Sequence, residues 1–444
     1  MHTFLLCSGL LLAAPPDLET WPGFLYSPPP SLTATTLPLQ WSPTENVAWR
    51  TALPGYGQSS PVVWNGTVFV TSIEGDNKET NHVVALRLSD GAEVWRKSFA
   101  SSTPVANSLY VSRAAPTPTV DLRHVYAFFE SGDIVALTHA GDVAWQRSLT
   151  KDYGPLKAEF GLAASVAQDE ASVFLLVEHD GPSYLLALDK ETGETRWKVP
   201  REARISWSSP MLLEIDGVPQ VVINSVGSVD SYAPETGDLL WSAAGLGGNT
   251  VASPQLAGTN MILVGASPGR DGKNADLARG SNLALRLERE GQTWKPTTAW
   301  QLKGPMSSFA SPIAHKDYAY WINRAGVMTC IDIRSGEEMY SERLEESCWA
   351  TPLVVEDRVY CCGKDGVTTV IAAGPTFKKL AVNRLWESES VVIKPAIVEK
   401  ESTPERRAAA ANFAAPVQYG AAAIEGSLLI RTGAALYCLR NEVK

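Results

Sequence analysis

The sequence of 444 residues has few of the residues that mark several classes of protein. Six cysteines are too few for a disulfide-stapled scaffold of this length. The six histidines show neither an i, i+4 pair nor a Cys/His spacing, so the sequence does not support a zinc site. Acidic residues outnumber basic ones, 48 to 38, and the net charge of −10 argues against a nucleic-acid partner.

Long apolar runs are missing as well. The run at residues 3–14 is too short to span a bilayer and is followed by Pro15-Pro16. It fits a signal peptide over residues 1–14 that lacks a positively charged start, and a buried N-terminal strand is the alternative interpretation. We therefore expect an exported protein, periplasmic or extracellular in a bacterium, that is soluble and monomeric and has no transmembrane segment.

Tryptophan, by contrast, is abundant at 14 residues, and a short motif recurs along the chain. The motif is two small residues followed by proline. Its copies are Ser59-Ser60-Pro61, Ala114-Ala115-Pro116, Ser208-Ser209-Pro210, Ala252-Ser253-Pro254, Ala310-Ser311-Pro312, Ala350-Thr351-Pro352 and Ala414-Ala415-Pro416, with Ala164-Ser165-Val166 as an eighth that lacks the proline. Recurrence every 40–64 residues indicates a repeat architecture.

A second motif closes most repeats: an apolar strand, a polar turn with glycine, and an aromatic residue four positions after the glycine. The glycines are Gly91, Gly141, Gly193, Gly237 and Gly336. A short hairpin loop needs one residue with positive φ, which glycine adopts without steric cost. The aromatic residues of this slot are Trp95, Trp145, Trp197, Trp241 and Tyr340, with Trp300 after a longer hairpin in the fifth repeat; the seventh repeat lacks the aromatic.

Two further alternating stretches lie between the motifs, so each repeat comprises about four short strands, which is typical of propeller blades. We predict an all-β fold, an eight-bladed β-propeller of four-stranded antiparallel blades over residues 37–444. An extended segment, 15–36, precedes it, and insertions lie at 266–282 and 387–411. The last repeat is one strand short. Residues 46–53, with Trp49 in the aromatic slot, supply its outer strand, so that pairing of the N- and C-terminal strands closes the ring.

We expect the slot residues to fill the wedge between adjacent blades rather than to bind a ligand. They are Trp49, Trp95, Trp145, Trp197, Trp241, Trp300 and Tyr340. Burial of such a ring removes about 150–250 Å² of surface from water, which is a large contribution to a structural contact.

The pattern A-L-D-x-x-T-G-x-x-x-W at 187–197 resembles the tryptophan-docking motif of the PQQ-like, or quinoprotein, eight-bladed propellers. That superfamily includes the PQQ-dependent alcohol dehydrogenases and the BamB-like propeller lipoproteins of the outer-membrane assembly machine. More narrowly, the chain is similar over 37–440 to exported PQQ-like repeat proteins of planctomycetes and related bacteria. The matching stretches are 37–64, 116–137, 179–197, 365–375 and 426–439.

The resemblance raises the possibility of a quinoprotein enzyme, which holds PQQ and calcium with Asp, Glu, Asn and Arg side chains and a vicinal disulfide. We find no matching set of Asp, Glu and Asn. The vicinal pair Cys361-Cys362 falls in a strand of the seventh repeat, where adjacent residues face opposite sides, so we interpret it as two inert, half-buried thiols. The sequence 265–269 matches G-x-S-x-G without the following helix, and 271–276 only faintly resembles a calcium loop.

Candidate binding residues lie where the chain enters the innermost strands, near the mouth of the channel. They are Gln58, Arg113, Glu159, Trp207, Asn249, Phe309, Trp349, Asn412 and Phe413. Rings with a few polar groups form a platform for a ligand or peptide, and packing of the channel is the alternative.

The leading hypothesis is a non-catalytic scaffold without catalytic residues, metal or cofactor. Its partner is an envelope protein or peptide, or a small ligand. The alternatives are a PQQ-dependent alcohol or aldehyde dehydrogenase with calcium, and an outer-membrane assembly factor of the BamB type.

Overall fold

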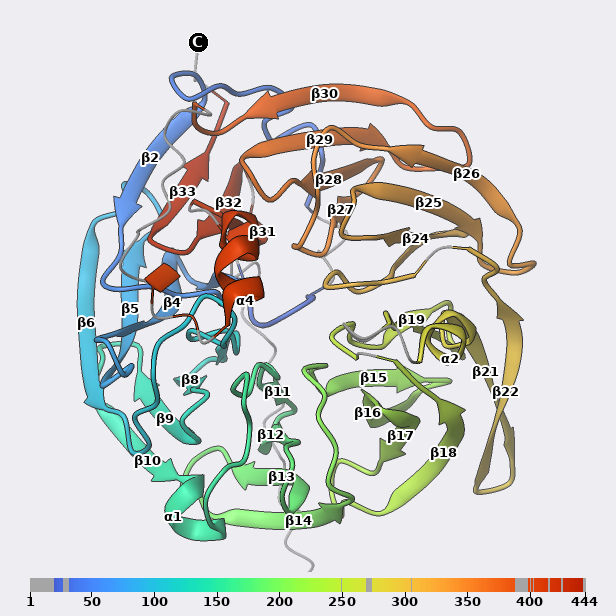
Figure 1. The fold of residues 1–444 in the computed structure, drawn as a ribbon, viewed down its shortest axis with the longest axis horizontal. Coiled ribbons are helices and arrows are strands. Elements are labelled where there is room, and N and C mark those ends of the chain that lie inside the picture. Colours follow the sequence, from blue (N-terminus) through green and yellow to red (C-terminus); the bar gives the residue numbers. More distant parts are fainter. Residues whose placement is uncertain are drawn as a thin grey trace, which may run out of the picture.

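The computed structural model describes residues 20–26, 32–248, 250–268, 274–304, 306–387, 398–399, 401, 403–413, 416–424 and 426–441. The segment predicted to be a signal peptide, 1–14, lies outside these residues. Within them, eight antiparallel sheets are arranged as a ring around a central axis (Figure 1), and we call the interior of this ring the channel. No helix of the described part is long and apolar enough to cross a membrane.

Each sheet is one blade, and its strands run from the channel outwards in chain order, except that β2 supplies the outermost strand of the last blade. Blade 1 comprises β3 (Val62–Trp64), β4 (Thr67–Glu74), β5 (Thr80–Arg87) and β6 (Glu93–Ala100), and blade 2 comprises β7 (Thr119–Val120), β8 (His124–Phe128), β9 (Asp133–Thr138) and β10 (Val143–Ser148). Blade 3 comprises β11 (Ala167–Gln168), β12 (Ser172–Val177), β13 (Ser183–Asp189) and β14 (Thr195–Arg201), and blade 4 comprises β15 (Met211–Ile215), β16 (Val218–Ser225), β17 (Gly227–Tyr232) and β18 (Leu239–Leu246).

The remaining blades complete the ring. Blade 5 comprises β19 (Gln255–Ala257), β20 (Met261–Val264), β21 (Leu283–Glu290) and β22 (Thr293–Gln301), and blade 6 comprises β23 (Ile313–His315), β24 (Tyr318–Ile322), β25 (Val327–Asp332) and β26 (Glu338–Arg343). Blade 7 comprises β27 (Leu353–Val355), β28 (Arg358–Cys362), β29 (Val367–Ala372) and β30 (Lys379–Arg384), and blade 8 comprises β31 (Gln418–Ile424), β32 (Ser427–Thr432), β33 (Ala435–Leu439) and β2 (Val47–Ala52). Pairing of β2 with β33 confirms the predicted eight blades and their closure by the two ends of the chain.

Part of the N-terminal segment enters the channel. The short strand β1 (Thr20–Trp21) pairs with β3, on the channel side of the innermost strand of blade 1. Just after it, the carbonyl of Pro22 accepts hydrogen bonds from the amide of Val120 and the hydroxyl of Thr119. Trp21 is buried. The segment that we expected only to be extended thus joins the first two blades from inside the ring.

The aromatic slot lies on the outermost strand of each blade beside an irregular step in the strand pairing. Trp95, Trp145 and Trp197 each lie opposite an alanine of the third strand, which leaves room for the ring. Their indole nitrogens, and those of two other slot residues, donate to carbonyls in the hairpin loop of the next blade. These bonds are Trp49 to Leu88, 2.9 Å; Trp95 to His139, 2.8 Å; Trp145 to Lys190, 2.8 Å; Trp197 to Pro234, 2.8 Å; and Trp300 to Ile333, 2.7 Å.

Two slot residues depart from this arrangement. Trp241 donates instead to the side-chain oxygen of Gln220 in its own blade, at 2.8 Å. Tyr340 packs its ring against Phe377 of the next blade, with 5.4 Å between ring centroids. The slot therefore tolerates different polar partners as long as a large ring fills it.

The turn glycine of the second motif is required for two reasons, of which the sequence indicated one. Gly193 has φ +72°, a conformation that side chains rarely adopt. A Cβ on Gly193 would also lie 2.6 Å from the ring of Trp145 in the preceding blade. Glycine thus permits both the turn and the close approach of the docked tryptophan.

The first motif supplies hydroxyl groups that link the innermost strands of seven blades. Each backbone amide donates to the hydroxyl of the next blade: Ser60 to Thr117, 2.9 Å; Thr117 to Ser165, 3.0 Å; Ser165 to Ser209, 2.9 Å; Ser209 to Ser253, 2.8 Å; Ser253 to Ser311, 2.9 Å; and Ser311 to Thr351, 2.9 Å. These bonds correct the second copy of the motif, which is Pro116-Thr117-Pro118 rather than Ala114-Ala115-Pro116. Pro116 and Pro118 each follow a small residue, and only Thr117, before Pro118, takes part in the series of hydrogen bonds between blades.

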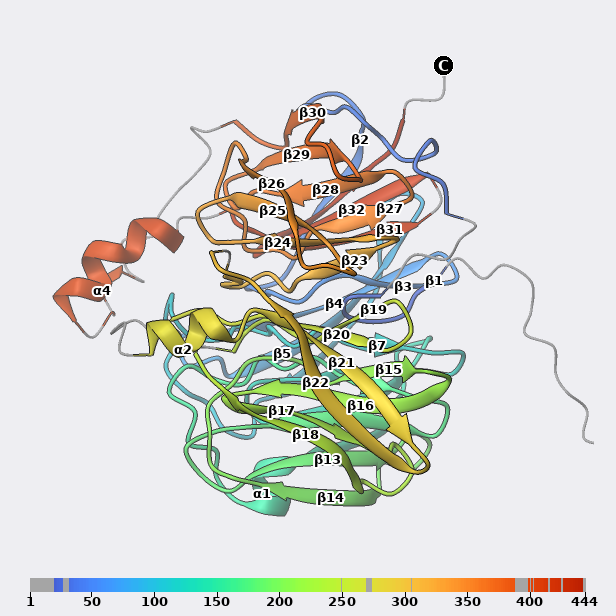
Figure 2. The ribbon, with the colours of Figure 1, turned by 90° about the vertical axis from the view of Figure 1, so that its right-hand side faces the viewer.

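Both insertions carry helical structure. The first contains α2 (Ala275–Gly280), and the second contains α4 (Pro404–Ala408) and the start of the 3-10 helix η2 (Ala409–Phe413). A third helix, α1 (Leu149–Tyr153), follows β10. Figure 2 shows α2 and α4 on the same side of the ring.

Candidate functional site

One face of the ring carries the loops that join the outermost strand of one blade to the innermost strand of the next. It also carries α2 and α4, and we call it the insertion face (Figure 2). The candidate binding residues all belong to these loops by their position between strands. Asn249 lies outside the described residues, as does the side chain of Asn412. The other seven are placed together on this face.

Four of the candidate residues are rings that belong to a longer row. Phe309 and Trp349, from the loops that enter blades 6 and 7, have centroids 5.1 Å apart. Trp349 lies 5.4 Å from Phe413, which precedes blade 8. Phe413 lies 4.5 Å from Tyr110, in the loop that enters blade 2. Rings from four separate loops therefore form a continuous contact.

A cation continues the row. The guanidinium of Arg406 lies 5.5 Å from the ring centroid of Tyr110 and 5.4 Å from that of Phe160. Phe160 in turn lies 6.1 Å from Trp207, the fourth candidate ring. We call this row the aromatic arc: Phe309, Trp349, Phe413, Tyr110, Arg406, Phe160 and Trp207. It crosses the loops that enter six blades.

The second insertion holds the arc together. Residues 401 and 403–413, here called the strap, come from the connection between blades 7 and 8 but dock on loops of blades 2 and 3. The buried carboxylate of Glu401 accepts from the amide of Leu109 at 2.7 Å and from the hydroxyl of Ser108 at 2.8 Å. Arg406 pairs with the candidate residue Glu159 at 2.8 Å. The described part of the insertion that we predicted at 387–411 is thus bound at two points of the ring.

The helix of the strap begins at a well-defined cap. The hydroxyl of Thr403 accepts from the amide of Arg406 at 3.2 Å, and Pro404 occupies the first turn, where its missing amide costs nothing. This cap fixes the backbone at Arg406. The carbonyl of Arg406 accepts from the hydroxyl of Tyr110 at 2.7 Å. Backbone and side chain of Arg406 therefore both fix the middle of the arc.

The sequence analysis missed Tyr110, Phe160 and Arg406. Phe160 follows the candidate Glu159 directly, and Tyr110 precedes the candidate Arg113 by three residues, so an aromatic residue in the same loop was the available signal. Nothing in the spacing of the sequence places Arg406 against them.

Gln58 and Arg113 form a separate contact between the loops that enter blades 1 and 2. The amide of Gln58 donates to the carbonyl of Arg113 at 3.0 Å, and the amide of Arg113 donates to the side-chain oxygen of Gln58 at 2.9 Å. This reciprocal pair fixes the backbone at Arg113.

Two buried cations elsewhere on this face have carboxylate partners. Lys78 pairs with Glu130 at 3.2 Å between blades 1 and 2. Arg201 pairs with Glu178 at 2.8 Å and with Asp230 at 2.9 Å between blades 3 and 4. Burial is the largest influence and acts to lower the pKa of Arg201, but Glu178, Tyr232 and Asp230 together outweigh it and the pKa is raised. These charges are neutralised within the protein, so they stabilise the junction between blades rather than offer a reactive group.

The vicinal cysteines are more deeply buried than we predicted. Cys361 contacts the core shared with blade 6, and Cys362 contacts the core shared with blade 8. The expectation of half-buried thiols was wrong because β28 is a middle strand, covered on both faces by neighbouring blades. Burial raises the pKa of Cys361 well above its ordinary value and that of Cys362 to about 11, so neither is a thiolate at neutral pH.

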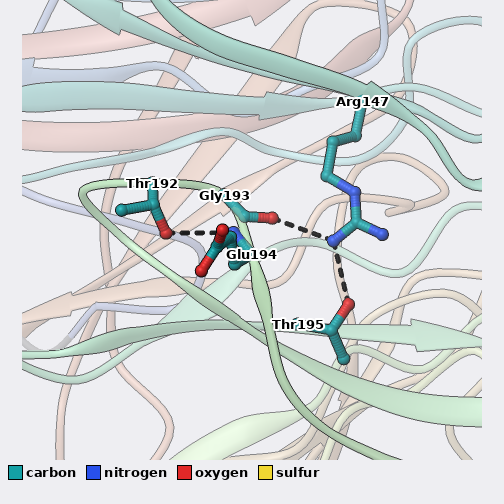
Figure 3. A pocket seen from close by; sticks show the side chains of 5 residues that line it. All are labelled: Arg147, Thr192, Gly193, Glu194 and Thr195. Atoms are coloured by element: carbon teal, nitrogen blue, oxygen red, sulfur yellow. Dashed lines mark hydrogen bonds between the residues drawn. The ribbon is translucent and has the colours of Figure 1, made fainter.

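A hollow of about 280 Å³ lies away from this face, on the outer rim between blades 2 and 3. Figure 3 shows Arg147 reaching across it, where its guanidinium donates to the carbonyl of Gly193 and the hydroxyl of Thr195, both at 2.9 Å. Gly193 is the turn glycine against which Trp145 docks. The hollow is therefore part of the junction between blades.

No three His, Cys, Asp or Glu side chains gather into a possible metal site among the residues that the structure describes. The acids described above on the insertion face are engaged by lysine, arginine, amide or hydroxyl groups.

Comparison with known proteins relates the chain to two groups. The family model described as outer membrane protein assembly factor BamB matches residues 39–160, 155–299 and 287–424. The solved quinohemoprotein alcohol dehydrogenase from Comamonas testosteroni is 12% identical, with a TM-score of 0.55; the match covers 92% of this chain and 79% of that one. The computationally designed protein Ika8 is also 12% identical, with a TM-score of 0.53, and the match covers 88% and 98%.

BamB from Moraxella catarrhalis is 15% identical with a TM-score of 0.49, and the match covers 74% of this chain and 95% of that chain. No protein with a curated description matches the sequence. Identities this low show the fold alone. The family match, by contrast, extends over most of the propeller.

Proposed function

Because the chain belongs to the family described as outer membrane protein assembly factor BamB, we propose that it is a non-catalytic binding propeller exported to the bacterial cell envelope. Its insertion face binds an extended segment of another envelope protein. The finer proposal, taken from the family description, is that this partner takes part in assembly of outer-membrane proteins. The aromatic arc is the observation that carries the proposal.

The arc has the properties of a binding surface. Phe309 is 37% exposed, and Trp349, Trp207 and Phe413 are half-buried, so all four residues remain partly accessible to solvent. Trp207 is held in place by a hydrogen bond of 3.1 Å from its indole nitrogen to the carbonyl of Gly161. Aromatic and arginine side chains dominate binding energies, and rings that are already fixed lose little entropy on binding.

The charges beside the rings suggest the kind of segment that binds. Arg406 lies between Tyr110 and Phe160 and also pairs with Glu159. The ammonium of Lys364, which pairs with Asp365, is 5.8 Å from the ring centroid of Trp349. We therefore propose a segment in which apolar side chains alternate with carboxylates. Its apolar groups lie on the rings and its acids lie near these cations.

A set of synthetic ten-residue peptides tests this proposal. Acidic-aromatic peptides are compared with basic-aromatic peptides of equal length by calorimetric titration against the full chain. We expect the acidic set to bind, and the double variant Phe309→Ala, Trp349→Ala to weaken binding by about thirtyfold, equivalent to about 2 kcal/mol. Leu122→Ala removes an exposed apolar side chain from the turn between β7 and β8, outside the insertion face, and serves as the control. Equal affinities for the double variant and the wild type would contradict the proposal.

We further propose that the protein works without PQQ or calcium. The support is chemical: the described acids beside the channel mouth already have partners, as reported above. Titration with PQQ and Ca²⁺ is expected to leave tryptophan fluorescence and melting temperature unchanged. Turnover of an alcohol or aldehyde by the protein mixed with PQQ and Ca²⁺ would overturn this proposal in favour of the dehydrogenase.

A further inference from the structure

We propose that Arg113, with the hydroxyls of Tyr56 and Tyr419 and the nearby charge of Arg431, forms a binding site for a carboxylate at the channel edge of the insertion face. The inference rests on the proposed function and specifies it, because it names the chemical group of the bound segment that this face recognises. The site lies where blades 8, 1 and 2 meet.

Arg113 is buried without the partners that a buried cation normally has. Its residue is 2% exposed, and its guanidinium lies over the ring of Tyr56, 3.7 Å from the centroid. The nitrogens Nε and Nη2 have no hydrogen-bond partner in the structure. Gln58 fixes the backbone of Arg113, so the side chain emerges from a defined position.

A second arginine adds positive charge beside the first. Arg431 is fully buried, and its two terminal nitrogens donate to the carbonyls of Ala435 at 3.3 Å and Thr71 at 3.2 Å. Its Nε has no partner. Burial lowers its pKa to about 9, while the hydroxyls of Tyr56 and Tyr419 act in the opposite direction. Arg431 therefore serves as a fixed neighbouring charge, since its terminal nitrogens are already used.

The contrast with other buried cations on this face is informative. Lys78 and Arg201 each have a carboxylate within 3.2 Å. Among the described residues, no carboxylate forms an ion pair with Arg113 or Arg431. An uncompensated buried charge is costly, and a bound anion offsets that cost.

The donors at the site suit a carboxylate. A guanidinium presents parallel N–H groups that match the two oxygens of a carboxylate. The hydroxyl oxygens of Tyr56 and Tyr419 are 2.7 Å apart, so one donates to the other and the second hydroxyl proton remains to donate to a ligand. Burial raises the pKa of Tyr56, which therefore remains a neutral donor.

The position of the site connects it with the aromatic arc. Tyr110, in the middle of the arc, precedes Arg113 by three residues in the same loop. A segment whose apolar side chain lies on the arc can extend a carboxylate towards the channel edge. That carboxylate is either an aspartate or glutamate side chain or the C-terminus of the segment.

The test uses the full chain and matched probes. N-acetyl-tryptophan carries a free carboxylate, and N-acetyl-tryptophan amide has the same ring without the charge; inorganic phosphate reports binding of anions in general. By calorimetric titration we expect the acid to bind at least about tenfold more tightly than the amide. Arg113→Gln is expected to abolish that preference, and Arg147→Gln, which alters an arginine of the outer rim, to retain it.

A measurement on the wild type keeps the test decisive if Arg113→Gln does not fold. With arginine labelled with ¹⁵N, the acid is expected to shift one buried Nε–H resonance that the amide leaves unchanged. Equal binding of acid and amide would overturn the proposal, as would a preference retained in Arg113→Gln or binding of phosphate without the acid. Two further sets of peptides then identify the source of the carboxylate. Peptides that end in a carboxylate or an amide test the C-terminus, and peptides with internal Asp→Asn changes test a side chain.

Failure of this inference can be told from failure of the proposed function. If peptides bind through Phe309 and Trp349 but show no preference for a carboxylate, the proposed function stands and the site at Arg113 is wrong. If the preference for the acid depends on Arg113 but the double variant binds peptides as tightly as the wild type does, the carboxylate site stands and the proposed binding of peptides to the aromatic arc is wrong.

Discussion

The outer rim and the insertion face of this ring both use tryptophan, but they use it differently. On the rim, Trp145 is buried against a glycine turn and its nitrogen donates to a carbonyl of the next blade. On the insertion face, Trp349 is half-buried and contacts only two other rings and a lysine among the ring and cation contacts of the structure. The aromatic slot recurs in nearly every blade, so its residues stabilise the fold. The aromatic arc occurs once, and we propose that its half-buried rings serve in recognition.

The largest expected effect comes from removing a slot residue. Trp145→Ala leaves a cavity between blades 2 and 3 and removes the indole N–H that donates to the carbonyl of Lys190, so we expect the free energy of unfolding to fall by about 3–5 kcal/mol. Chemical denaturation measures this. Trp349→Ala is the matched control on the insertion face and should cost much less, because its ring is partly in solvent. Equal losses for the two variants would remove the distinction between rim and face.

The turn glycine offers a sharper test of the rim. Gly193→Ala combines a residue at positive φ with a Cβ that would lie 2.6 Å from the Trp145 ring. We expect a loss of about 1–3 kcal/mol in denaturation experiments. Gly217→Ala has a similar φ of +76° with no atom within 4 Å of the new Cβ, so it isolates the backbone cost. If both variants lose the same stability, contact with the docked tryptophan is unimportant.

A smaller and local effect is expected for the strap. Glu401→Gln removes the charge that accepts from Leu109 and Ser108, and we expect the local stability of residues 403–413 to fall by about 1–2 kcal/mol. Hydrogen exchange in this segment should accelerate while the global unfolding transition changes little. Glu399→Gln, at an exposed glutamate two residues earlier, should change neither. Unchanged exchange in Glu401→Gln would show that other contacts hold the strap.

The rim was predictable from the sequence because its constraints recur. The glycine, the aromatic four residues later and the hydroxyl before the innermost strand appear blade after blade, and repetition makes a weak local pattern recognisable. Among the copies that the structure describes in full, the second was misplaced, because Pro116 and Pro118 each follow a small residue. The copy at 414–416 lies partly outside the described residues. The slot exceptions at Trp241 and Tyr340 show that the pattern specifies the ring rather than its hydrogen bond.

The insertion face was predictable only in part. The position of a residue before an innermost strand is enough to place Trp207, Phe309, Trp349 and Phe413 on one side of the ring. The contacts of Glu401 and Arg406 join residues separated by 293 and 247 positions and occur once, so no periodicity reveals them. The missing partners of Arg113 depend on which side chains surround it in three dimensions, which neither composition nor spacing specifies.

Hydrogen exchange measured with and without a bound acidic-aromatic peptide tests the central claim most directly, because it locates the binding surface without assuming which residues matter. We predict slower exchange in the loops at 156–163, 205–208, 307–310 and 346–350 and in the strap. The turns on the opposite face and the outer strands of the rim should be unchanged. Protection of that opposite face or of the rim, with none in these loops, would contradict the assignment of binding to the insertion face.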